Sequence, residues 1–198
     1  MGLALPWRTL DWIFKLKDNA QSGVIGMSGV MGSPGPKGWV DQALKKDIDF
    51  DFMRREAMQK AAEAFKEFKE VTKGIDPPMK PWKDFHQDFE NINDARAAWG
   101  SHPWVQALKK SNISPFFECE FGYFCLDKED PEVAFIERAY RNAISTHSVL
   151  KDGKWYEKGK MGWFGISFNE TEDWNDQFDQ LLNSIPDDSL ISIYDCHI

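Results

Sequence analysis

The chain has 198 residues, of which 32 are acidic and 24 are basic, so its formal net charge is −8. Hydrophobic residues make up 42% of it, which is enough to form a core, but it has no run of about 18 apolar residues that could span a bilayer. The acidic balance excludes a general nucleic-acid binder, because affinity for phosphates depends on clustered lysines and arginines.

The charges are distributed unevenly along the chain. Residues 1–112 hold 17 basic and 15 acidic residues, whereas residues 113–198 hold 7 basic and 17 acidic ones, giving net charges of +2 and −10. We therefore expect an apolar arm with a glycine tract over 1–38, a helical region over 39–112 and an acidic domain over 113–198. The acidic surface either meets a basic partner or serves only solubility, and both interpretations stay open.

A short apolar stretch lies near the N-terminus and contains Trp12 and Phe14, with lysines interleaved. It is too short to be stable as an isolated helix, so we expect it to dock either on a partner subunit or on the body of the protein. Trp12 and Phe14 are therefore candidate partner-binding residues.

Glycine then recurs at every third position: Gly23, Gly26, Gly29, Gly32, Gly35 and Gly38. This tract resembles a collagen-like Gly-X-Y repeat, in which only glycine fits at the axis of three polyproline-type chains. The first triplets lack the proline that such a repeat favours, so an irregular loop and a short trimeric tract are both open. Short collagen-like tracts occur in fibre and spike proteins of bacteriophages, and the resemblance therefore implies that these glycines serve assembly.

Three helices are predicted in the middle of the chain. The apolar spacing over residues 52–73 is helical, and Gly74, Pro77 and Pro78 stop the helix. Shorter helices are predicted over 92–99 and 104–110, the second opened by Ser101 and Pro103. We expect their aromatic residues to be core residues or docking anchors rather than contacts to a cofactor.

The last part of the chain has the order strand, helix, strand, strand, helix, strand. Asp130 and Pro131 open the first helix, whose apolar stripe includes Val133 and Tyr140, and Trp174 begins the second. The strands are expected over residues 117–125, over 147–150 and 155–157 around an Asp152-Gly153 turn, over 162–168 and over 190–198. This order predicts an α+β chain with a C-terminal ferredoxin-like (βαββαβ) domain, in which two helices cover one face of the sheet.

The stretch KDGKWYEKGKMGWFGISF over residues 151–168 and the closing DDSLISIYDCHI are similar to small uncharacterised proteins carried by bacteriophages and prophages. The resemblance extends over residues 113–198 and brings neither a catalytic motif nor an established activity. It implies a phage-type protein.

The open face of the predicted sheet is a candidate partner-binding surface. Met161 and Trp163 are expected there beside Glu118 and Glu120 of the neighbouring strand. RNA-recognition domains use the same face, but carboxylates repel phosphate and Gly165 stands where a second stacking aromatic is expected. We therefore expect the face either to bind a basic, partly apolar protein or to be covered by residues 1–112.

Motifs for catalysis or metal binding do not occur in the sequence. It has no G-x-S-x-G elbow, no P-loop, no H-E-x-x-H and no cysteine pair at zinc spacing. Asp47, Asp49 and Asp51 imitate a calcium loop that lacks its glycine and its bidentate ligand. Cys119, Cys196 and His197 could converge on zinc, although small buried cysteines are the commoner outcome. We expect no cofactor and no metal.

These observations predict a non-enzymatic phage-type protein that acts through protein–protein contacts, as a virion or tail-associated structural or assembly protein that could form a homotrimer. The alternative is an intracellular inhibitor that offers its acidic domain to a host defence or nucleic-acid-processing enzyme. An enzyme with an unrecognised site near His86, His102, His147 or His197 is the second alternative. Lacking a signal-peptide pattern, the chain is expected in the virion or the host cytoplasm, with no direct nucleic-acid contact and no membrane span.

Overall fold

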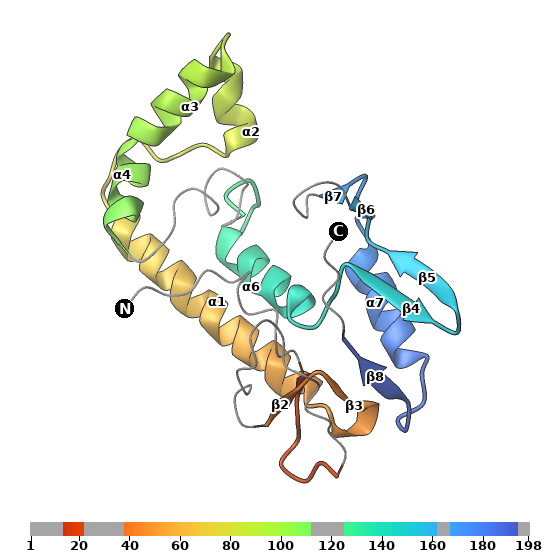
Figure 1. Ribbon diagram of the computed structural model, residues 1–198. Coiled ribbons are helices and arrows are strands. Elements are labelled where there is room, and N and C mark those ends of the chain that lie inside the picture. Colours follow the sequence, from red (N-terminus) through yellow and green to blue (C-terminus); the bar gives the residue numbers. More distant parts are fainter. Residues whose placement is uncertain (1–13, 22–37, 112–124, 162–166, 194–198) are drawn as a thin grey trace, which may run out of the picture. The chain divides into compact units, whose positions relative to one another are not determined.

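The computed structural model describes residues 14–21, 38–111, 125–161 and 167–193, and it shows a mixed fold of α-helices and small antiparallel sheets (Figure 1). Within these ranges no helix combines the length and the apolar character needed to cross a membrane. The expected strand over 117–125 lies outside the described residues, apart from Cys125. So do residues 162–166 of the strand over 162–168 and residues 194–198 of the last strand.

Contacts divide the chain into two units. Among the described residues, the first unit holds Glu56–Tyr140, and the second holds 14–55 together with 141–193. The division falls inside helix α1 (Phe50–Thr72) and inside helix α6 (Pro131–Asn142). It differs from the expected segments, because residues 39–55 group with the C-terminal tail rather than with the helical middle.

The first unit is helical and confirms the predicted helices. Besides its parts of α1 and α6 it contains α2 (Trp82–Phe85), a 3₁₀ turn η3 (His86–Asp88), α3 (Ile92–Ser101) and α4 (Pro103–Lys110). Helix α1 stops where predicted, at Gly74, whose φ of +71° is a left-handed conformation that favours glycine. The buried residues that form its core are Ala61, Phe65, Phe68, Met79, Trp99, Val105, Leu108, Cys125 and Phe135.

Helix α4 begins differently from the prediction. Pro103 is its first residue as expected, but the cap is His102, whose Nδ1 accepts a hydrogen bond from the Trp104 backbone N–H at 3.3 Å. Burial lowers the pKa of His102, which favours the neutral ring that can accept this bond. Ser101 instead ends α3 and donates its hydroxyl to the Ala98 carbonyl.

Among its described residues, the second unit contains four antiparallel pairs of strands, a 3₁₀ turn η2 (Lys45–Asp47), the start of α1, the end of α6 and a further α-helix. Strand β1 (Phe14–Lys15) pairs with β2 (Trp39–Val40), and β3 (Gln42–Leu44) pairs with β8 (Leu190–Ser192). The predicted hairpin is confirmed as β4 (Ser148–Lys151) and β5 (Lys154–Glu157), and β6 (Lys160–Met161) pairs with β7 (Ser167–Phe168). Helix α7 (Trp174–Asn183) follows, as predicted.

The pairing of β3 with β8 joins two distant parts of the chain. Ala43 lies opposite Ile191, and the Gln42 side chain donates a hydrogen bond to the Ser192 hydroxyl, 150 residues away. Both strands have only three residues, and their pairing explains why residues 39–55 belong with the tail.

The core of the second unit takes residues from both ends of the chain. Its buried members are Phe14, Val40, Ala43, Ile48, Met53 and Ile144. Phe14 is 6% exposed, and its ring lies edge-on to Phe50 with centroids 6.4 Å apart. The N-terminal apolar stretch was expected to dock on a partner subunit or on the body of the protein. Phe14 docks on the body of its own chain.

Candidate functional site

The predicted partner-binding and assembly residues fall mostly outside the described ranges. Trp12, Glu118, Glu120, Trp163 and the glycines from Gly23 to Gly35 all lie there. Met161 is in β6, paired opposite Ser167. Gly38 has a φ of +83°, a left-handed conformation that favours glycine, so the local fold accounts for a glycine here.

The β4–β5 hairpin carries two of the exposed large apolar side chains among the described residues of the second unit, and Leu190 of β8 is another. Its turn residues Asp152 and Gly153 have φ values of +52° and +75°, the left-handed conformations of a type I′ turn that matches the twist of the strands. Opposite each other in the register are Val149 and Tyr156, then Leu150 and Trp155. Because side chains alternate along a strand, the two pairs lie on opposite faces of the hairpin.

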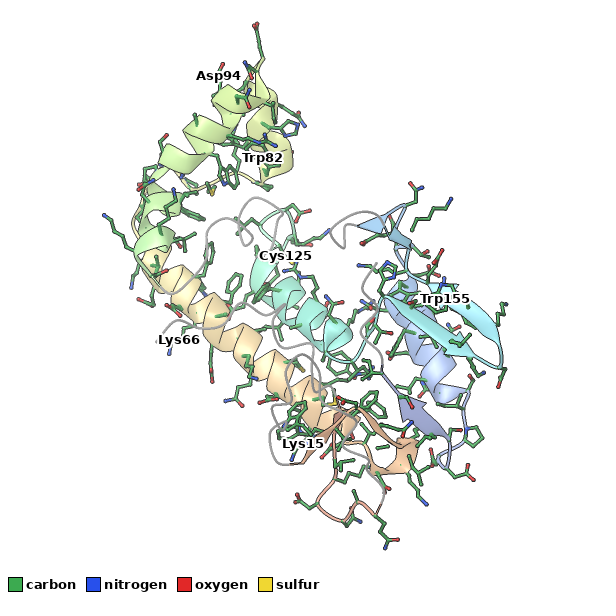
Figure 2. All side chains as sticks on the ribbon, viewed as in Figure 1. Lys15, Lys66, Trp82, Asp94, Cys125 and Trp155 are labelled. Atoms are coloured by element: carbon green, nitrogen blue, oxygen red, sulfur yellow. The ribbon has the colours of Figure 1, made fainter. Side chains whose placement is uncertain are left out.

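The face that carries Leu150 and Trp155 is called the outer face. Leu150 is 67% exposed and Trp155 is 55% exposed, although both are large apolar side chains (Trp155 is labelled in Figure 2). The Trp155 Nε1–H donates to the Glu157 carboxylate on the same strand at 3.0 Å, which fixes the direction of the indole. Sequence reasoning missed this pair, because the alternation of the strands does not say which face meets the body of the protein.

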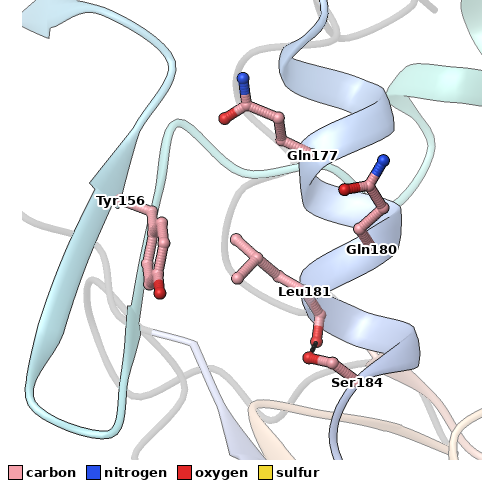
Figure 3. A pocket seen from close by; sticks show the side chains of 5 residues that line it. All are labelled: Tyr156, Gln177, Gln180, Leu181 and Ser184. Carbon is pink, nitrogen blue, oxygen red and sulfur yellow. Dashed lines mark hydrogen bonds between the residues drawn. The ribbon is translucent and has the colours of Figure 1, made fainter.

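The opposite face of the hairpin and helix α7 enclose a small groove of about 230 Å³ (Figure 3). Tyr156 forms the wall on the hairpin side, while Gln177, Gln180, Leu181 and Ser184 line the groove from the helix. Gln180, Leu181 and Ser184 follow Gln177 by three, four and seven residues, so the four positions lie on a single face of α7. The Tyr156 ring and the Leu181 side chain are its apolar surfaces.

Lysines from the hairpin lie at the edge of this groove. The Lys151 ammonium donates to the Ser184 hydroxyl at 2.8 Å, and that hydroxyl donates to the Leu181 carbonyl at 2.7 Å. Lys154 lies opposite Lys151 in the register, and its ammonium is 4.7 Å from the centre of the Tyr156 ring. The groove therefore combines an aromatic wall and neutral polar groups with two positive charges.

The carboxylates of α7 are directed to other partners. Asp173 accepts a hydrogen bond from the Gln177 side chain, Asp176 contacts Arg141 at 3.5 Å and Asp179 contacts Arg54 at 2.5 Å. None of the three lines the groove. An acidic helix thus presents a neutral face to the hairpin.

Titratable groups with shifted pKa values lie elsewhere. Burial raises the pKa of Cys125, and the hydrogen bond that Lys80 donates to the Asp88 carboxylate raises the pKa of Lys80. Like His102, these residues belong to the first unit. No group of three histidine, cysteine or acidic side chains that could hold a metal occurs among the described residues. The convergence expected for Cys119, Cys196 and His197 lies outside those residues.

Two of the three aspartates that resemble a calcium loop, Asp47 and Asp49, are accounted for by the local fold. Asp47 is buried, at 8% exposure. The Asp49 carboxylate accepts a hydrogen bond from the Phe52 backbone N–H at 2.9 Å, which caps the start of α1. The helix start thus explains this part of the motif without an ion.

No family model, curated protein or solved structure matches the chain.

Proposed function

We propose that this protein acts through protein–protein contacts and that the outer face of the β4–β5 hairpin is its docking surface. The observation that carries the proposal is the exposure of Leu150 and Trp155, directly opposite each other on adjacent strands. Tryptophan is enriched among the residues that dominate binding energy at interfaces. A hairpin with a type I′ turn presents the pair on a regular backbone, which lowers the entropy lost on binding.

The groove supports binding better than catalysis. Its lining offers a phenol, two carboxamides and a hydroxyl, and among the described residues neither the phenol nor the hydroxyl has a hydrogen bond to a histidine or carboxylate that could activate it. The Ser184 hydroxyl already accepts from Lys151 and donates to a backbone carbonyl. The arrangement is suited to recognising a polar group.

Site-specific photo-crosslinking in living cells tests the proposal. Replacing Leu150 with p-benzoylphenylalanine places a photoreactive group on the outer face and leaves Trp155 in place. We expect discrete adducts with another protein chain, and we expect them to disappear when Trp155→Ser is added. The matched control carries the same group at Ile92, which is 46% exposed on α3. If adducts are missing at position 150, or are the same at both positions, the outer face is not the docking surface.

We further propose that these contacts serve a virion or tail-associated structural or assembly role. The support is the glycine repeat over residues 23–38 and the resemblance of residues 151–168 to phage-borne proteins. The ferredoxin-like arrangement belongs to this proposal. In it the last strand is an edge strand, so β3 can extend the sheet by pairing with β8.

Light scattering tests the assembly role. We expect the full chain to be a trimer and the variant Gly29→Glu/Gly32→Glu to be a monomer, because no side chain fits at the axis of a collagen-like bundle. Substitution is preferable to deleting residues 1–38, since that deletion would also remove the buried Phe14. A full-length monomer would contradict the trimer.

The alternative function, an inhibitor that presents its acidic tail to a basic groove, stays a prediction from the charge of residues 113–198. Asp176 and Asp179 of the tail contact arginines of their own unit, which favours docking through the hairpin.

A further inference from the structure

We propose that the groove between β5 and α7 binds the carboxylate of an acidic side chain on the partner protein. This inference rests on the proposed function and deepens it by naming the chemistry of the partner. The groove has lysines at its edge, whereas residues 113–198, in which it lies, are acidic overall.

The first argument comes from the two lysines of the hairpin. Lys151 and Lys154 are directly opposite in the register, and like charges in that relation destabilise a pair of strands. The Lys151 ammonium donates to the hydroxyl of Ser184, which lines the groove, and it lies 4.0 Å from the exposed Asp152 carboxylate at the turn. The Lys154 ammonium lies 4.7 Å from the centre of the Tyr156 ring. A carboxylate bound in the groove would add to the partial compensation that Asp152 gives and would gain a charge-assisted hydrogen bond.

The lining of the groove has two hydrogen-bond donors that the described residues leave unused. Within those residues, no hydrogen bond engages the Tyr156 hydroxyl or the Gln180 carboxamide, and both groups line the groove. A hydroxyl and a carboxamide N–H can each donate to a carboxylate oxygen. Together with the lysines they form a set of donors suited to an acceptor that carries negative charge.

The third argument is the direction of the acidic side chains on α7. Asp173, at the N-cap, accepts a hydrogen bond from Gln177, and Asp176 and Asp179 contact Arg141 and Arg54, so none of the three carboxylates lines the groove. The volume of about 230 Å³ suits one side chain rather than an extended polyanion.

The experiment uses the full chain, ¹⁵N-labelled, and two small probes that differ only in charge. One is N-acetyl-glutamate methylamide, and the other is the neutral N-acetyl-glutamine methylamide. We expect the glutamate probe to shift the side-chain amide signal of Gln180 saturably, with a dissociation constant on the order of 10 mM, which is typical of a fragment. The glutamine probe should bind at least about tenfold more weakly, because it lacks the charge.

Matched variants assign the effect to the groove. Lys151→Gln should weaken binding of the glutamate probe by roughly tenfold, and Tyr156→Phe by about threefold, since the second removes only one neutral donor. Lys66→Gln is the control, because it removes one positive charge from an exposed lysine of the first unit. Equal shifts with both probes, or equal losses in Lys151→Gln and Lys66→Gln, would overturn the inference.

The outcome is separable from that of the proposed function. If the groove binds no glutamate probe but adducts at position 150 persist, the docking surface stands and the acidic chemistry of the partner is wrong. If the probe binds as expected but position 150 gives no adduct, the groove is a carboxylate site and the outer face is not the docking surface.

Discussion

Two tryptophans of the second unit have opposite surroundings, and their neighbours decide their roles. Trp174 is 2% exposed, and its indole N–H donates to the Thr146 carbonyl at 2.7 Å. Trp155 is 55% exposed and bonds a carboxylate on its own strand. The first contributes to folding, whereas the second leaves its apolar surface available to a partner.

Replacing Trp174 with phenylalanine should lower the free energy of unfolding by about 1–3 kcal/mol, because the Thr146 carbonyl loses its donor and the smaller ring leaves a gap. Urea unfolding followed by far-UV circular dichroism measures the change. Trp155→Phe is the control and should alter stability by less than about 0.5 kcal/mol, since its side chain is exposed. Similar losses for both variants would contradict these roles.

Single residues show where prediction from the sequence stopped. Phe14 was expected at an interface with a partner or on the body of the protein, and only the fold places it in the core. In α6 the expected apolar stripe is partly wrong, because Val133 is 49% exposed and Tyr140 39%, whereas Phe135 is buried. Helical spacing defines the faces of a helix, but the neighbouring elements decide which face is covered.

At the scale of elements, local signals predicted most helices to within about two residues. Caps, glycine stops and apolar spacing all act within a few residues, so one sequence is enough to read them. The hairpin was also predictable, since Asp152-Gly153 determines its turn. Strands β1, β2 and β3 were not, because strands of two or three residues depend on distant partners.

Two glycines of the first unit should respond oppositely to alanine. Gly100 lies in helix α3 with open space around the position of a Cβ, so Gly100→Ala should raise the free energy of unfolding by about 0.5–1 kcal/mol. Gly74 ends α1 with a φ of +71°, so Gly74→Ala should lower it by about 1–2 kcal/mol.

Thermal unfolding of both variants beside the unmodified protein measures these changes. Each glycine serves as the control for the other, since the substitution and the unit are the same. A loss of stability in both variants would mean that helix α3 does not tolerate a side chain at position 100.

At the scale of the whole molecule, the candidate site was only partly predictable. The hairpin and α7 were each expected, but the groove between Tyr156 and Gln180 exists only once the two are packed together. Which face of the hairpin remains exposed depends on that same packing. The two elements of the site are therefore predictable from local patterns, whereas their arrangement depends on tertiary packing.

A fragment of residues 113–198 should not fold by itself, although the charge distribution suggested an independent domain. It lacks β3, the partner of β8, and it lacks most of the buried core of the second unit, including Val40 and Ile48. We expect narrow amide dispersion in its ¹H–¹⁵N spectrum, with the full chain as the dispersed control. A dispersed spectrum of the fragment would contradict this expectation.

The pairing of Gln42 with Ser192 also bears on the order of events during synthesis. The two residues are 150 positions apart, so a ribosome adding about 5–20 residues per second needs roughly 7–30 s between them. Until the tail emerges, Phe14, Val40 and Ile48 lack part of the core that covers them. The helical stretch made in the interval can form its local contacts early. Nascent chains that stall before β8 would therefore present an apolar N-terminal segment to chaperones and proteases.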